Sequence, residues 1–313
     1  MSAPPSPRRP PPVKLVAFDV DGTLTNSRHE VTEATRAAVS AVRAAGIHVV
    51  LATGRRYRDT LPVAAALGLT GPLVTASGAL VKRTSDHATL FRAAFAPDVL
   101  AGVLDAIVSA GHEPVVYSDS YEDGFDFHCR CLPDGPRPPD GHPQGLADLA
   151  EYLERNRQLA RVDPDLRRRP PVDAFAGFAM GAFDPMIALE HALHAAFPGR
   201  LSLHTIRSPR YLHWMCEIAP SGVTKWSGIA AVAGELGVAP EEICAVGDDV
   251  NDLPMIRAAG LGVAMGNARP EVLAAADHVV AEHDRDGIVQ LADLLLSGEP
   301  PAPRGLSQTT PPR

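Results

Sequence analysis

The chain has 313 residues, 45% of them hydrophobic and 21% charged, which is typical of globular proteins and excludes wholesale disorder or a fibrous repeat. The formal net charge of −8 disfavours binding to phosphate backbones or anionic lipids, so we expect neither nucleic-acid nor membrane partners. The sequence shows no apolar run of transmembrane length, and its first residues lack the apolar stretch of a secretory signal, so we expect neither a membrane span nor secretion. Its four scattered cysteines are expected to be reduced thiols of a cytoplasmic protein.

Proline is concentrated at the two ends of the chain. Of the 30 prolines, six lie in residues 1–12 and five in residues 298–313. Such proline-rich segments cannot bury enough apolar surface to fold. We therefore predict disordered tails at 1–12 and 298–313, with the folded part between them.

The first folded segments alternate between short apolar runs and amphipathic runs. Strands are predicted at 13–18, 47–52 and 72–75. A helix is expected between Thr32, a candidate N-cap, and Gly46, and another covers about 57–67. This β-α-β-α-β order indicates an α/β fold with a doubly wound parallel, Rossmann-like sheet.

The pattern changes over residues 84–216, where strands group together with fewer helices. Helices are predicted at 98–109, 146–158 and 185–196, and strands at 113–118, 175–182, 201–206 and 211–218. A proline-rich loop covers 132–143. The α/β order then returns, with a helix at 223–236 and a strand at 243–246. We predict a core domain built from 13–83 and 217–297, interrupted by an inserted α+β domain at 84–216.

Polar residues follow the predicted core strands, where open α/β sheets bind their ligands. They are Asp19 and Asp21 after the first strand, Thr53 and Gly54 after the second, and Asp248, Asp249 and Asp252 after the late strand. Lys225 lies near the start of the helix before that late strand. Several carboxylates at one sheet edge need a compensating cation, and Mg²⁺ fits such oxygen ligands.

Together these residues could transfer a phosphoryl group. A carboxylate beside Mg²⁺ and a lysine can accept the phosphoryl group as an aspartyl phosphate, and a second carboxylate can move protons. Lys225 and the Thr53 hydroxyl would hold the transferring oxygens, and Gly22 and Gly54 would let the backbone approach them. Each residue alone has an ordinary structural interpretation, as a turn, cap or surface residue. The occurrence of these residues at the ends of successive strands favours the functional interpretation.

The sequence resembles the haloacid dehalogenase-like hydrolases. Asp19-Val20-Asp21-Gly22-Thr23-Leu24 matches their DxDGT motif, and Gly247-Asp248-Asp249-Val250-Asn251-Asp252 matches their GDxxND motif. Thr53-Gly54-Arg55 and Lys225 match the two motifs between them. The insert between the second and third motifs is similar to the C2-type cap of the Cof-like subgroup (HAD-IIB). Ser77 departs from that subgroup, which has asparagine at this position.

The resemblance implies a role for each matched residue. It implies that Asp19 is the nucleophile and Asp21 the general acid and base. It implies that Mg²⁺ binds Asp19, Asp248 and the main-chain carbonyl of Asp21. Phosphate-binding residues would be Thr53, Gly54, Gly22 and Asn251, with Lys225 neutralising the phosphoryl charge. Asp252 would orient Lys225 or a metal-bound water, and Asp249 would lie outside the direct metal ligands.

The favoured function is a Mg²⁺-dependent phosphatase acting on a small phosphorylated metabolite, for example a sugar phosphate. The size of the inserted domain favours such substrates, because a protein chain could hardly reach beneath it. A phosphomutase of the same fold and a non-catalytic protein that binds a phosphorylated ligand are the alternatives. A P-loop nucleotide-binding module is disfavoured, because the sequence contains no GxxxxGK[ST] motif.

Overall fold

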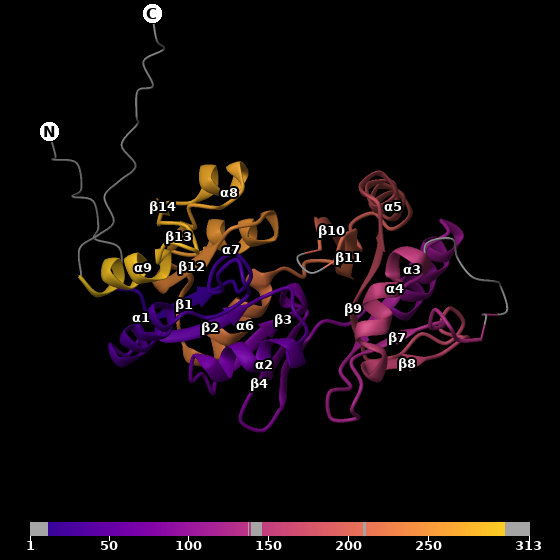
Figure 1. The fold of residues 1–313 in the computed structure, drawn as a ribbon, viewed down its shortest axis with the longest axis horizontal. Helices are drawn as coiled ribbons and strands as arrows, with labels where there is room; N and C mark the ends of the chain where they lie inside the picture. Colours follow the sequence, from indigo (N-terminus) through magenta and orange to yellow (C-terminus); the bar gives the residue numbers. More distant parts are fainter. Residues whose placement is uncertain (1–11, 137, 139–145, 209–210, 298–313) are drawn as a thin grey trace, which may run out of the picture. The chain divides into compact units, whose positions relative to one another are not determined.

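The computed structural model describes residues 12–136, 138, 146–208 and 211–297. Apart from residue 12, both predicted tails lie outside the described residues, as do residues 137 and 139–143 of the 132–143 loop. The chain divides into two compact units (Figure 1). The first comprises Met1–Thr53, Val63–Gly71 and Ile229–Arg313, and the second Gly54–Pro62 and Pro72–Gly228. No helix within the described ranges has the length and apolar character needed to cross a membrane.

A parallel sheet forms the centre of the first unit. Its strands are β1 (Leu15–Phe18), β2 (His48–Ala52), β12 (Ile243–Gly247), β13 (Leu261–Ala264) and β14 (His278–Val279). In space their order is β14-β13-β12-β1-β2, and each of these pairs is parallel. The chain therefore runs outward from β1 in both directions, and the predicted doubly wound α/β fold is confirmed.

The local sequence explains these elements. All four residues of β1 are buried, as expected for a strand covered on both faces. Helix α1 (Glu33–Ala44) begins at Thr32, whose Oγ1 accepts a hydrogen bond from the Thr35 amide at 3.1 Å, as an N-cap should. The later helices are α7 (Leu253–Ala258), α8 (Pro270–Ala275) and α9 (Gly287–Leu296). Helices α1 and α9 pack against each other (Figure 1).

Two of the four boundaries between the units lie inside helices. These helices are α2 (Tyr57–Ala66) and α6 (Lys225–Leu236). The second unit contains the antiparallel strands β3 (Pro72–Thr75), β4 (Leu80–Arg83) and β5 (Thr89–Arg92). Strand β3 agrees with the sequence prediction, whereas β4 and β5 were not predicted.

A second sheet of six strands dominates the second unit. Its order is β10-β11-β9-β6-β7-β8. The strands are β6 (Val115–Ser118), β7 (Phe127–Cys129), β8 (Ala160–Val162), β9 (Ala174–Gly181), β10 (Leu201–Arg207) and β11 (Trp214–Pro220). The helices are α3 (Pro97–Ser109), α4 (Leu146–Arg155) and α5 (Phe183–Ala196). The three predicted helices and all four predicted strands are present, whereas the three-residue strands β7 and β8 were not predicted.

The two faces of this sheet have different neighbours. Residues of α3 and α5 form one apolar cluster with Leu203 of β10 and Cys216 and Ile218 of β11. Residues of α4 form another with Phe178 and Met180 of β9. Because side chains alternate along a strand, the helices α3 and α5 cover one face and α4 covers part of the other.

Candidate active site

Three carboxyl groups converge at the carboxyl ends of β1 and β12, the strands where the doubly wound sheet changes direction. Asp19 directly follows β1 and is 4% exposed, and Asp248 directly follows β12. Asp252 ends the short helix η4 (Val250–Asp252) and is fully buried. One carboxylate oxygen from each lies within 4.8 Å of the others. Carboxylates this close repel one another unless a cation compensates them, so this group could hold a metal ion.

Asp252 shapes the turn that carries Asp248. Its Oδ2 accepts hydrogen bonds from the backbone amides of Asp248 at 2.9 Å and Asp249 at 3.1 Å. A Cβ at Gly247 would overlap the Asp252 carboxyl group, so only glycine fits there. The side chain of Asp249 caps the helix, because its Oδ1 accepts a hydrogen bond from the Val250 amide at 2.7 Å.

The loop after β1 presents Asp21. The backbone amides of Leu24 and Thr25 both donate to the Val20 carbonyl at 3.0 Å, which folds the loop tightly. Gly22 has a positive φ of 77°, and a Cβ there would overlap the Asp248 carboxyl group. Gly22 is therefore required both by its conformation and by its close approach to Asp248.

Asn267 connects this loop to Asp248. Its Nδ2 donates to the Gly22 carbonyl at 2.9 Å and approaches Asp248 Oδ2 at 3.4 Å. Its Oδ1 accepts from the His283 amide at 3.0 Å, which fixes the orientation of the side-chain amide. Thr23 Oγ1 lies 3.3 Å from the other oxygen of Asp248. The Asp248 carboxylate is thus held from both sides.

Thr53 and Asn251 belong to the same unit as this acidic group. Thr53 directly follows β2 and is 1% exposed. Asn251 lies in η4, and its Oδ1 is buried without a hydrogen-bond partner among the described residues. A buried amide oxygen in this situation can accept a hydrogen bond from a ligand, while the Nδ2 group of the same amide is the donor that a phosphate oxygen would need. Both residues were predicted to contact phosphate, and that role stays a prediction.

Lys225 and Gly54 belong to the second unit. Lys225 is the first residue of α6 and only 2% exposed. Gly78 has a φ of 97°, and a Cβ there would overlap the carbonyl of Thr224, so the turn before β4 packs closely on the start of α6. That Lys225 and Gly54 meet Asp19 at one site remains a prediction.

The sequence matches one family over most of its length. A sequence model of the haloacid dehalogenase-like hydrolases matches residues 16–128 and 178–291. The chain belongs to this family. The family membership and the enzyme class, a hydrolase, that were predicted from the motifs are therefore confirmed.

Individual relatives of this hydrolase resemble it along nearly the whole chain. The stress response protein YhaX of Bacillus subtilis (strain 168) is 30% identical over 89% of this chain and 91% of its own length. The HMP-PP phosphatase of Serratia proteamaculans (strain 568) is 28% identical over 83% of this chain and 86% of its own. The solved structure of the subclass IIB sugar phosphatase BT4131 has the same fold, with a TM-score of 0.69 at 22% identity, covering 89% of this chain and 97% of that one.

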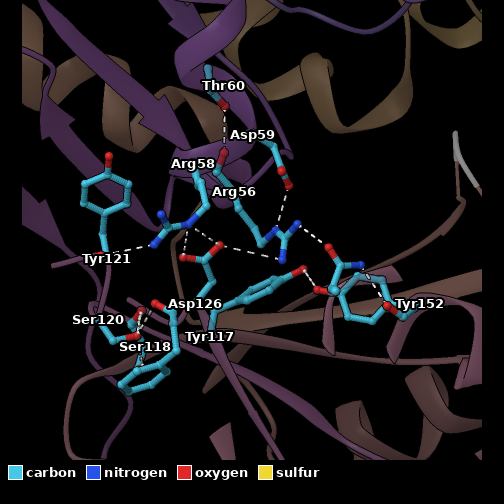
Figure 2. A network of polar contacts seen from close by, with 12 residues as sticks. Arg56, Arg58, Asp59, Thr60, Tyr117, Ser118, Ser120, Tyr121, Asp126 and Tyr152 are labelled. Carbon is cyan, nitrogen blue, oxygen red and sulfur yellow. Dashed lines mark hydrogen bonds and ion pairs between the residues drawn. The ribbon is translucent and has the colours of Figure 1, made fainter. Parts of the chain in front are cut away.

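In this hydrolase, two arginines anchor the segment that follows Thr53 and Gly54 (Figure 2). Arg58 Nε donates to both oxygens of Asp126, at 3.0 and 3.2 Å. Arg56 donates to Asp59 Oδ2 and to Asn156 Oδ1, each at 2.7 Å. Burial raises the pKa of Asp126, although both guanidinium groups act in the opposite direction. The start of α2 is thereby fixed to the residue before β7 and to the end of α4.

Sequence reasoning assigned no role to two residues that the structure places beside predicted site residues, Asn267 next to Gly22 and Asp248, and Glu217 in the same cavity wall as Gly54. Asn267 lies in the segment Gly262–Ala268, which resembles the family, but no role was assigned to it. Glu217 is the only charged residue of β11, whose sequence is WMCEIAP. A single carboxyl group in an otherwise apolar strand is a signal that could have identified it.

Proposed function

We propose that this hydrolase is a Mg²⁺-dependent phosphatase that cleaves a small phosphorylated metabolite through an aspartyl phosphate on Asp19. The observation that carries the proposal is the convergence of Asp19, Asp248 and Asp252 within 4.8 Å. The names of relatives support the reaction and the substrate class, since they include an HMP-PP phosphatase and a sugar phosphatase. We further propose that residues 84–216 form a cap over a core built from 13–83 and 217–297.

The residues present fit a hard divalent cation. Their donor atoms are carboxylate oxygens, which Mg²⁺ prefers to nitrogen or sulfur. In our proposal Asp19, Asp248 and the main-chain carbonyl of Asp21 hold the ion, while one oxygen of Asp252 is already shared by two backbone amides. Bound Mg²⁺ would neutralise charge on the phosphoryl oxygens during transfer.

Asp19 and Asp21 divide the chemistry between them. A carboxylate oxygen of Asp19 attacks phosphorus, the ester P–O bond breaks, and protonated Asp21 gives its proton to the leaving oxygen. Asp21, now a carboxylate, then takes a proton from water. That water oxygen attacks phosphorus, the bond to Asp19 breaks, and inorganic phosphate leaves with both aspartates restored.

The other predicted residues hold the phosphoryl group during both steps. Lys225 supplies positive charge, and the Thr53 hydroxyl, the Asn251 amide and the backbone near Gly22 and Gly54 donate hydrogen bonds. Asp252 and Asp249 stabilise the turn that carries Asp248, because their side chains accept hydrogen bonds from its backbone amides.

We propose a cytoplasmic location. All four cysteines, Cys129, Cys131, Cys216 and Cys244, are buried free thiols. Free thiols are the usual state of cysteines in a reducing compartment.

The proposed activity is tested with p-nitrophenyl phosphate. Purified protein should release inorganic phosphate in the presence of Mg²⁺, EDTA should abolish the release, and added Mg²⁺ should restore it. Activity that persists in EDTA would contradict the role of the cation. Activation by a sugar bisphosphate with little net phosphate release would instead identify a phosphomutase. Binding of phosphate esters without turnover would identify a non-catalytic protein.

Asn267→Ala is expected to weaken Mg²⁺ binding. Removing the amide frees both the Gly22 carbonyl and Asp248 Oδ2, which it now connects. Loss of a group that orients a metal ligand typically costs about 10- to 100-fold in metal affinity. Calorimetric titration with Mg²⁺ measures the loss directly. The activity of the variant, relative to that of the natural protein, should be higher at saturating Mg²⁺ than at limiting Mg²⁺. An unchanged dissociation constant would show that Asn267 has no such role. Thermal unfolding in EDTA controls for a general loss of stability.

A further inference from the structure

A cavity lies on the face of the six-stranded sheet that α4 covers only in part. Its wall includes Tyr117 of β6, Met215 of β11, and Ser202 and His204 of β10. Ser202 and His204 are two residues apart on one strand, so they project from the same face of the sheet. His204 is directly opposite Glu217 of β11, which also lines the cavity. Strand β10 therefore contributes two polar side chains to one wall.

Two of the residues predicted to hold the phosphoryl group lie at or beside this cavity, within the same unit of the chain. Gly54 lines the cavity. Val223 also lines it and precedes Lys225 by two residues. Neighbouring Cα atoms are about 3.8 Å apart along the chain, so Lys225 begins less than about 8 Å from the wall. An organic group in the cavity is thus within reach of a phosphate held by Gly54 and Lys225.

The polar side chains of the cavity wall differ in whether the protein satisfies them. The Ser77 hydroxyl donates to Glu217 Oε2 at 3.0 Å. The hydroxyl of Tyr117 lies 3.3 Å from that of Tyr152 (Figure 2). By contrast, the Ser202 hydroxyl and the His204 imidazole have no hydrogen-bond partner among the described residues. These two side chains therefore remain available to a molecule in the cavity.

The chemistry of these two side chains favours hydroxyl groups as partners. Burial lowers the pKa of His204, so its imidazole is neutral at physiological pH and carries one N–H donor and one acceptor nitrogen. A serine hydroxyl also both donates and accepts. A ligand that displaces water from this wall must replace the hydrogen bonds of both groups or leave them unpaired. Their backbone positions are about 7 Å apart along the strand, so different hydroxyl groups of one ligand would meet them.

We infer that Ser202 and His204 select the organic part of the substrate, which carries several hydroxyl groups that bond to these side chains and packs its C–H surface against Tyr117 and Met215. This inference rests on the phosphatase function proposed above. A phosphorylated polyol or sugar has this chemistry, because it presents hydroxyl groups on successive carbons. An alkyl phosphate of the same length would displace the water but leave both side chains unpaired, so it is a poorer substrate.

The test compares two phosphate esters with the same five-carbon chain, xylitol 5-phosphate and pentyl phosphate. The ratio of kcat/KM for the polyol ester to that for the alkyl ester is measured in the natural protein and in His204→Leu/Ser202→Ala. It should fall by about tenfold or more in the double variant, since one unpaired polar group alone costs roughly this factor. Comparing ratios between variants cancels the intrinsic reactivity of the two esters and any general loss of activity or of folded protein.

Three single variants show whether hydrogen bonding is responsible. Ser202→Ala removes one oxygen atom and should lower the ratio in the same direction as the double variant. His204→Gln keeps a donor and an acceptor on the side chain and should retain most of the natural ratio. His191→Leu is the matched control, since His191 is exposed on α5, and it should leave the ratio unchanged.

The outcomes separate this inference from the proposed function. The natural ratio in the double variant, or a ratio in His204→Gln as low as that of the double variant, would overturn the inference while leaving the phosphatase intact. Natural protein that hydrolyses p-nitrophenyl phosphate but not xylitol 5-phosphate would do the same. An unchanged ratio in Ser202→Ala would overturn the role of Ser202. Failure to hydrolyse any of the three esters would overturn both proposals.

Discussion

Asp19→Asn is expected to lower the rate of phosphate release by about 10⁴-fold or more, because the variant lacks the nucleophile. An amide oxygen is a poor nucleophile and forms no stable bond to phosphorus. Asparagine is nearly isosteric with aspartate, so the buried position after β1 stays filled. Release of phosphate from p-nitrophenyl phosphate at saturating Mg²⁺ measures the loss.

Asp21→Asn provides the control that separates the nucleophile from the proton carrier. It keeps Asp19, and p-nitrophenolate leaves without needing a proton, so the first step survives. The second step lacks a group to accept the proton of the attacking water. Acid quenching after mixing with a radiolabelled ester should therefore trap labelled protein in Asp21→Asn and none in Asp19→Asn. Label on Asp19→Asn, or Mg²⁺-dependent turnover close to the natural rate, would show that another residue is the nucleophile.

The acidic site could be predicted because sheet topology brings distant parts of the sequence together in a regular way. Asp19 and Asp248 each directly follow a buried strand, and the two strands pair in parallel. Their carboxyl ends must then meet at the same edge. The contacts of Asn267 with Gly22 and Asp248 could not be predicted in the same way. They depend on the turn after β13, whose course no hydrophobic pattern determines.

The cavity on the six-stranded sheet, whose walls include Tyr117, His204 and Glu217, could be predicted even less. It depends on which residues of β9, β10 and β11 lie opposite one another, and a shift of one residue would turn Glu217 to the other face. The register between β9 and β11 is hard to predict from the sequence, because α5 and β10 separate these two strands along the chain. The Ser77–Glu217 hydrogen bond joins two such separated segments.

The failure to predict strands β4, β7 and β8 has a simpler cause. Strands β7 and β8 are only three residues long, too short to show alternation. Strand β4 contains Lys82. A lysine is expected to be exposed on the surface, but this residue is only 3% exposed. Its Nζ forms an ion pair with Asp119 at 2.7 Å and donates to Thr89 at 2.8 Å. A lysine can be buried only with such partners, and these come from tertiary structure.

Glu113→Ala is expected to destabilise the second unit by about 3–5 kcal/mol, the usual cost of removing one partner of a buried ion pair. The side chains of Glu113 and Arg130 are both fully buried. Glu113 Oε2 accepts from Arg130 Nη2 at 3.0 Å, and Oε1 accepts from the Arg130 backbone amide at 3.0 Å. The substitution would leave a buried guanidinium group and a buried amide without this carboxylate.

Unfolding in urea, followed by tryptophan fluorescence, measures the change. Both tryptophans, Trp214 and Trp226, lie in the second unit, so their signal reports on the part of the chain that contains the pair. Glu151→Ala is the matched control, because the Glu151–Arg155 pair is exposed and such a pair is worth about 0.5 kcal/mol or less. Equal shifts in the two variants would contradict the argument from burial. In the double variant Glu113→Leu/Arg130→Met, both charges are gone and much of the stability should return, since no buried charge is left without its partner.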